Sequence, residues 1–164
     1  YNMPNVKAPR ISNKEDWKRK DWVDDMVNAI FNDELFRWFD SGDCYDLRLA
    51  KKIKQVIERT PTTKHWLPTR QHKFPKFTKV LTEIASLPNA VVRLSSDSIN
   101  GGIIKGDTTS TIWSTEPPKE AFECGAYTRN GECKDCRACW DKLVKVVAYP
   151  GHGAKMLKVI RLQG

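Results

Sequence analysis

The sequence lacks the features that most easily assign a protein to a class. No run of apolar residues approaches the roughly 18 that a membrane-spanning helix requires, and no signal-peptide pattern is visible. A P-loop, a GxGxxG motif after a strand, an HExxH motif and a GxSxG elbow are also missing. We therefore expect no membrane-bound segment, and any function must come from residues outside the common catalytic motifs.

The composition predicts one folded, basic domain. The 164 residues are 40% apolar and include six tryptophans, which suffices for one hydrophobic core. Lysine and arginine total 28 against 20 acidic residues, which gives a net charge of +8. This charge favours a polyanionic partner such as nucleic acid, because basic side chains neutralise phosphates. The lysines are dispersed along the chain: Lys51, Lys52, Lys54, Lys73, Lys76, Lys79, Lys142, Lys145, Lys155 and Lys158. An ordinary soluble surface that happens to be basic is the alternative.

Four of the five cysteines lie within residues 124–139, in the pattern C-x8-C-x2-C-x2-C. They are Cys124, Cys133, Cys136 and Cys139. Four thiolates at such spacing match a tetrahedral structural zinc site or a 4Fe–4S cluster. Spacing favours zinc, because no proline follows the last cysteine and the fourth ligand lies upstream. Two disulfides or free thiols are the alternatives.

The fifth cysteine, Cys44, stands alone in the sequence. An odd cysteine count, with the other four at metal-ligand spacing, favours a reducing compartment over a secreted disulfide framework. We therefore expect a cytoplasmic protein.

Helical and strand patterns alternate along the chain. Residues 1–11 are interpreted as an extended arm, and a capping box at Ser12 and Glu15 predicts a helix that runs to about Phe31. The further strands are expected at 35–39, 64–70, 90–94, 109–113 and 143–149, and the further helices at 45–59, 74–85 and 154–162. Asp43 or Asp46 could cap the helix that starts near residue 45.

This alternation predicts a single α/β domain over residues 1–164, built as a partial β/α barrel or as an open, mainly parallel sheet. The cysteine metal-binding segment, residues 122–141, is inserted between late strands. Because the last strands lack crossover helices, an α+β arrangement is the alternative.

Polar side chains follow the expected strands, and sites in parallel α/β folds gather at the carboxyl ends of strands. The catalytic candidates are Asp40, Asp43, Arg70 and His152, and the binding candidates are Arg70, Arg93, Ser95 and Asp97. The two aspartates at positions 40 and 43 could form an acid–base pair or hold a hard cation, or could serve as helix caps. The two arginines could clamp a phosphate or a carboxylate, or simply pair with nearby aspartates.

Several segments together resemble a phage-encoded family of uncharacterised proteins: RWFDSGD at 37–43, HWLPTR at 65–70, VRLSS at 92–96, and CKDCRACWD at 133–141 with His152. Members of that family are similar to radical-SAM proteins, so the resemblance implies a partial β/α barrel. It also implies that the four cysteines form an auxiliary site and strengthens the iron–sulfur alternative. The N-terminal cysteine group of the family, which would hold the cluster for S-adenosylmethionine, has no counterpart here. Phe39 stands where relatives are expected to carry a histidine.

Two functions follow as expectations. The first is a metal-binding phage protein that acts as a binding module on nucleic acid or on a host protein in the host cytoplasm. The second is a radical-SAM-like iron–sulfur enzyme, or a fragment of one without its N-terminal cluster motif. Whether the chain is an enzyme is left open by its residues.

Overall fold

The structure is a computed structural model that describes residues 4–40 and 42–152. The elements follow in the order α1 (Pro4–Asp16), α2 (Trp22–Ile30), β1 (Leu35–Arg37), α3 (Leu47–Arg59), β2 (Lys64–Thr69), η1 (Gln71–Lys73), α4 (Pro75–Ser86), β3 (Ala90–Ser95), β4 (Thr109–Trp113), β5 (Phe122–Glu123), η2 (Tyr127–Arg129), η3 (Ala138–Trp140) and β6 (Val146–Pro150). The three η elements are single 3-10 turns. None of the helices in these residues is long and apolar enough to cross a membrane.

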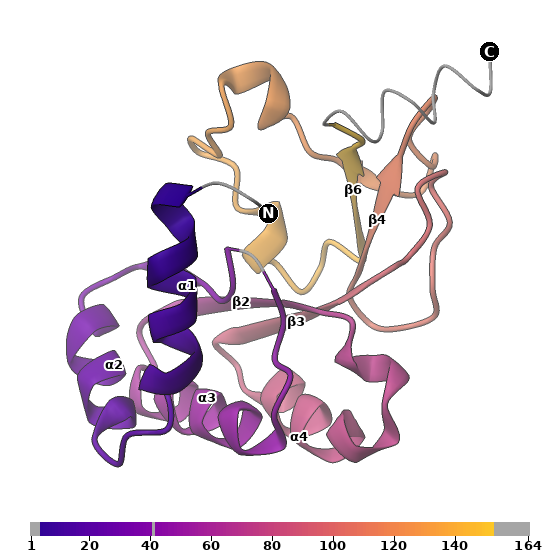
Figure 1. Cartoon of the computed structure of the whole chain (residues 1–164). Helices are drawn as coiled ribbons and strands as arrows, with labels where there is room; N and C mark the ends of the chain where they lie inside the picture. Colours follow the sequence, from indigo (N-terminus) through magenta and orange to yellow (C-terminus); the bar gives the residue numbers. More distant parts are fainter. Residues whose placement is uncertain (1–3, 41, 153–164) are drawn as a thin grey trace.

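The six strands form one sheet in the order β1-β2-β3-β4-β6-β5, and every neighbouring pair is parallel. The sheet curls into a half-barrel (Figure 1). The α/β prediction with a mainly parallel sheet is therefore confirmed. The connection from β4 to β6 contains β5 and the cysteine segment instead of an α-helix, so the insertion lies where the sequence places it.

The two faces of the β1–β3 region are covered differently. Helices α2, α3 and α4 lie on one face, and the segment after β5 lies over the other (Figure 1). Neighbouring residues of a strand point to opposite faces, so Leu67 joins the core under the helices whereas Trp66 packs with Cys139 and Val147 on the other side.

The apolar stripes of the helices explain the core. In α3, Leu49, Ile53, Val56 and Ile57 recur at helical spacing and are buried against the sheet. Of the two proposed caps, Asp46 is the one used, since its side chain accepts a hydrogen bond from Arg48 N at 2.8 Å and so satisfies a free amide of the first turn.

The N-terminal residues differ from the sequence interpretation. Residues 4–11 belong to α1 and are not an extended arm, because a proline such as Pro4 fits the first helical turn, where no N–H donor is needed. Ser12 and Glu15 consequently lie inside α1 and do not start a helix. The single helix predicted to reach Phe31 is divided into α1 and α2. Residues 1–3 lie outside the described residues.

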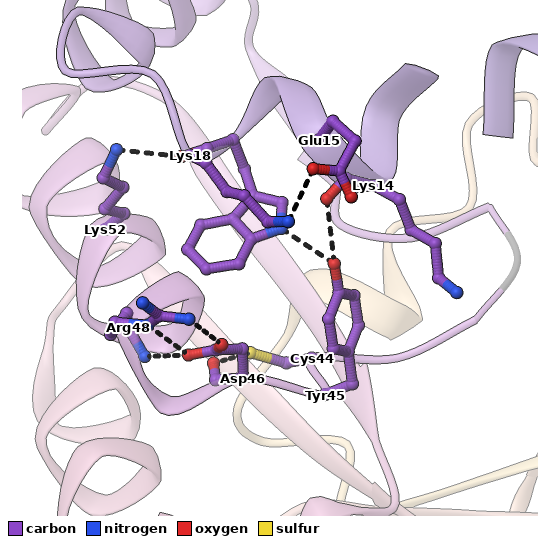
Figure 2. A network of polar contacts seen from close by, with 9 residues as sticks. Lys14, Glu15, Lys18, Cys44, Tyr45, Asp46, Arg48 and Lys52 are labelled. Atoms are coloured by element: carbon purple, nitrogen blue, oxygen red, sulfur yellow. Dashed lines mark hydrogen bonds and ion pairs between the residues drawn. The ribbon is translucent and has the colours of Figure 1, made fainter. Parts of the chain in front are cut away.

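The end of α1 is fixed on α3 by polar contacts (Figure 2). The indole N–H of Trp17 donates to the Tyr45 hydroxyl at 2.8 Å, and that hydroxyl donates to the Lys14 carbonyl at 3.1 Å. The ammonium group of Lys52 on α3 donates to the Trp17 carbonyl at 2.8 Å and to the Arg19 carbonyl. Lys52 thereby ties the residues that directly follow α1 to α3.

At the C-terminal side, β6 starts three residues later than the predicted 143–149 strand. The two-residue strand β5 was not expected from the pattern, because two residues show no periodicity. The helix predicted at 154–162 falls outside the residues described.

Candidate metal centre

The cysteine segment forms a small lobe on the sheet face opposite the helices. We call residues 124–144 the cysteine lobe; it begins after β5, contains η2 and η3, and leads into β6. Asn130, which lies between the first cysteine and the later three, and Lys134, which directly follows the second, have positive φ angles of 56° and 47°, so the chain turns sharply at both places. Its η3 turn contacts β2 and β3.

The lobe is attached to the sheet through the side chain of Arg93, in the middle of β3. This side chain is 0% exposed, and its guanidinium donates to five carbonyl oxygens. Four of these carbonyls belong to the lobe, at Ala138, Cys139, Asp141 and Val144, with distances of 2.6, 3.1, 2.9 and 2.9 Å. The fifth, at 3.3 Å, belongs to β4.

These contacts change the role expected for Arg93. A guanidinium carries five N–H donors, and all five have protein acceptors here. Arg93 therefore has no donor left for a phosphate or carboxylate ligand, and it pairs with neither Asp40 nor Asp97. It holds the lobe on the sheet.

The guanidinium is a buried positive charge whose hydrogen-bond partners are all neutral. Burial lowers the pKa of Arg93, whereas the nearby ionisable groups of Tyr149, Cys139 and Asp141 act in the opposite direction. A buried charge without a close counter-charge is costly. The Cys139 thiol is thus next to a cation that would stabilise its thiolate form.

The five thiols are free, and two of them lie in the same cluster. None of the five cysteines forms a disulfide, so the disulfide alternative is not realised in this structure. The side chains of Cys124 and Cys139 belong to one small apolar cluster with Trp66 and Val147. Cys139 Sγ lies 3.2 Å from the hydroxyl of Tyr149. Burial raises the pKa of Cys139 to about 11, although the hydroxyl and Arg93 act to lower it.

The cysteine lobe meets one of the two requirements of a metal site, the donor atoms, but not the second, their positions. The donor chemistry fits, because four thiols lie in one lobe, and the buried guanidinium of Arg93, which binds the Cys139 carbonyl, acts to lower the pKa of the Cys139 thiol. The present positions do not form a finished centre, since within residues 4–40 and 42–152 no group of three or more His, Cys, Asp or Glu side chains lies close enough to hold a metal ion. Binding would require the thiols to converge.

The predicted strand-end residues form two separate structural contacts. Asp43 accepts hydrogen bonds from Thr69 Oγ1 at 2.7 Å, from Arg70 N at 2.6 Å and from Cys44 N at 2.7 Å. It thereby ties the loop after β1 to the end of β2, and its carboxylate oxygens are already engaged. Asp46 instead serves as the helix cap.

Arg70 and Asp97, two of the binding candidates, form an ion pair with each other. Arg70 Nε lies 3.3 Å from Asp97, and Lys73 also pairs with this carboxylate. All three side chains are roughly half exposed, so the pairs contribute little to stability. The arrangement is an ion-pair group at the ends of β2 and β3.

The remaining candidates have different surroundings. Asp40 is exposed, and Ser95 Oγ accepts a hydrogen bond from Ser110 Oγ at 3.3 Å. His152 stacks on Tyr127 of the cysteine lobe, with ring centroids 5.3 Å apart. The structure therefore does not assemble Asp40, Asp43, Arg70 and His152 into a common site.

Three aromatic residues pack together near the lobe, an arrangement that sequence reasoning did not predict. The Trp66 ring stacks on Tyr149 and meets Trp140 edge-on, at centroid distances of 6.5 and 5.2 Å. Trp140 donates its indole N–H to the Phe36 carbonyl at 3.1 Å. The position of a tryptophan directly after the last cysteine is the sequence signal that could have indicated packing of the lobe on the sheet.

Fold and site define a class: an α/β half-barrel in which a cysteine-bearing lobe covers the sheet face opposite the helices. The model of the family described as Gene product 88 matches residues 1–142, and the chain belongs to this family. The family description follows the style of phage gene products, in line with the resemblance to a phage-encoded family. No curated protein and no solved structure matches the chain.

Proposed function

We propose that the chain is a metal-stabilised binding module for nucleic acid. In this proposal Cys124, Cys133, Cys136 and Cys139 bind one zinc ion, which closes the cysteine lobe on the sheet. Zinc bound by four thiolates carries a net negative charge and has no redox activity, so its role is structural. The folded module then presents its basic surface to the phosphates of the partner.

The observation that carries the metal proposal is the environment of Arg93. Four of its five donors bind the lobe backbone, including the carbonyl of Cys139 itself, yet its charge has no carboxylate within hydrogen-bonding distance in the described part of the chain. A buried charge is costly unless it is paired. An anionic thiolate centre in the lobe would supply the missing counter-charge.

Elemental analysis tests this proposal. We expect about one zinc per chain in protein purified without oxygen, because a four-thiolate site takes a single ion. Cys136→Ser should abolish retention of the metal, since it removes one ligand. Cys44→Ala is the matched control, because Cys44 is buried near Asp46 and outside the lobe. Metal-free wild-type protein that binds no added zinc would refute the metal centre.

Nucleic acid as the partner is supported by the net charge of +8. Phosphate neutralisation by lysine releases counter-ions, so binding should weaken steeply as salt increases. Fluorescence anisotropy with a short labelled DNA duplex across a salt series measures this directly. Absence of binding even at low salt would remove nucleic acid from the proposal, and a host protein would then be the partner to test.

A second candidate is a radical-SAM-like enzyme, or part of one, in which the same four cysteines hold an iron–sulfur cluster. The curled parallel half-barrel, with the lobe on the face opposite the helices, favours it. Anaerobic reconstitution with iron and sulfide should then give a brown protein with a visible absorption band. Zinc-loaded, colourless protein under the same conditions would count against it.

A further inference from the structure

The outer surface of the fold carries a hollow between α3 and α4, two of the three helices that cover the sheet. Helices α3 and α4 pack side by side (Figure 1), and the hollow between them has a volume of about 430 Å³. This volume lies within the roughly 300–1,000 Å³ typical of ligand pockets. It is lined by Leu47, Lys51, Lys54, Gln55, Glu58, Lys76, Lys79, Val80 and Glu83.

Four of the lysines that are dispersed in the sequence meet in this hollow: Lys51 and Lys54 from α3, and Lys76 and Lys79 from α4. Each pair is spaced by three residues, which places both members on the same side of their helix. Packing of α3 against α4 then makes one basic strip out of two sequence segments that are each about one helical turn long.

The charges are unevenly distributed along the hollow. Lys54 binds Glu58 and Glu83, at 3.3 and 3.1 Å, so both acidic residues of the lining are engaged by one lysine. Neither helix has an acidic residue in its first turn. The excess positive charge therefore comes from Lys51, Lys76 and Lys79.

These three side chains are exposed and have no hydrogen-bond or ion-pair partner among the described residues. Asp46, outside the lining, feels the charge of Lys76 but is paired with Arg48. Three like charges around one hollow repel each other, and an anion in the hollow would relieve that repulsion.

We propose that the hollow between α3 and α4 binds the phosphodiester backbone of nucleic acid without reading its sequence. This inference rests on the proposed function and names the surface that carries it. Lysine ammonium groups act as flexible point charges toward phosphates. The lining contains no aromatic side chain on which a base could stack and no arginine for bidentate contact with a guanine.

A triple charge reversal, K51E/K76E/K79E, tests the surface. The matched control is K105E/K119E/K145E, which removes the same number of exposed lysines elsewhere on the protein. Binding of a labelled duplex is measured by anisotropy over a salt series, with circular dichroism and zinc content recorded on the same samples. For K51E/K76E/K79E, we expect the slope of the logarithm of the binding constant against the logarithm of the salt concentration to fall in magnitude by about 2.7, or about 0.9 per lysine. The control K105E/K119E/K145E should retain most of the wild-type slope.

The outcomes separate the surface from the function. Equal losses in the two variants would overturn the hollow as the binding surface while nucleic-acid binding itself stands. No binding by the wild-type protein at low salt would overturn both. The third outcome concerns an acidic peptide of the same charge as the duplex. If this peptide binds the wild-type protein more tightly than the duplex does, and K51E/K76E/K79E no longer binds it, the hollow is a surface for a protein partner and the inference is overturned.

Discussion

Three helices cover β1, β2 and β3, whereas the chain between β4 and β6 contains no α-helix in the residues described. The helix-covered region encloses a continuous core to which α2, α3, α4 and the strands all contribute apolar side chains. In the region of the cysteine lobe, the buried cluster is small and consists of Trp66, Cys139 and Val147 with a few half-buried neighbours.

The difference shows two ways of attaching chain to a sheet. The helices are attached by burial of apolar area, which is non-directional and tolerates small shifts. The lobe is attached by four directional hydrogen bonds from one buried cation, together with aromatic packing. A lobe with so little apolar burial gains the most from an additional link such as a metal ion.

Metal removal should produce the largest contrast between the two regions. Thiolate–zinc binding contributes on the order of 10 kcal/mol in small zinc domains, and this energy is coupled to folding of the ligand segment. We expect a chelator to abolish amide protection in residues 124–144 while protection in α3 and α4 stays unchanged. Hydrogen exchange with mass spectrometry, with and without chelator, measures both regions in one sample.

Cys136→Ser without chelator should reproduce the exchange pattern of the metal-free protein, and Cys44→Ala should not. Unchanged exchange of the lobe after complete removal of all bound metal would show that the lobe holds its structure without an ion. The contrast between the regions would then rest on Arg93 and the aromatic contacts alone.

Phe77→Ala should destabilise the helix-covered region and, with it, the whole fold. Phe77 on α4 is 0% exposed, and removal of a buried phenyl ring leaves a cavity that costs about 4 kcal/mol. Urea denaturation gives the change in unfolding free energy. Phe74, 50% exposed at the start of the same helix, provides the control, and Phe74→Ala should cost well under half as much.

Arg93→Lys should loosen the lobe while keeping the positive charge. A lysine offers three donors in place of five, so at least two carbonyls lose a charge-assisted hydrogen bond, at a cost of about 3 kcal/mol. Faster exchange confined to residues 138–144 and to β4 is the expected pattern. Arg37→Lys is the control, because Arg37 is exposed and lies 4.7 Å over the Trp66 ring; loss of this contact should cost about 0.5 kcal/mol.

The elements of the helix-covered region could be predicted because their signals are local. The stripe of α3 and the apolar run of β3 each report burial within a dozen residues, and Asp46 precedes its helix as a cap should. The start at Pro4 was missed because α1 has no strong apolar stripe and contains prolines. A weak pattern of this kind also suits an extended arm.

The site was less predictable because its contacts are distant in sequence. Arg93 binds carbonyls 45 to 51 residues further along, and carbonyl acceptors exist at every residue, so no residue type announces them. The position of Arg93 near the end of the strand predicted at 90–94 equally suited a ligand clamp. Asp43 was open to several roles for the same reason, since its partners at Thr69 and Arg70 become neighbours only after β1 and β2 pair.

The smallest expected effect is an acid sensitivity that belongs to the helix-covered region. His65 is 1% exposed, and burial lowers its pKa to about 4. Thr60 Oγ1 donates to the Val56 carbonyl at 2.7 Å, so it accepts from His65 Nε2–H at 2.9 Å, which leaves Nδ1 as the bare nitrogen. Nδ1 is buried without a hydrogen-bond partner among the described residues, and its protonation would bury an unsatisfied N–H and a charge.

Because the folded pKa lies below the unfolded value of about 6.5, the unfolded state binds more protons as the pH falls, and stability decreases below about pH 6.5. At about pH 5 the expected loss from His65 is about 2 kcal/mol. Urea denaturation of His65→Phe and of the control His72→Gln at both pH values isolates this contribution. The pH-dependent loss should largely disappear in the first variant and persist in the second, because His72 is only half-buried in η1 and packs outside the core cluster. Equal acid sensitivity of His65→Phe and the wild type would assign the effect to other titratable groups. Faster hydrogen exchange at low pH in residues 124–144 alone would place the acid-sensitive region in the cysteine lobe instead.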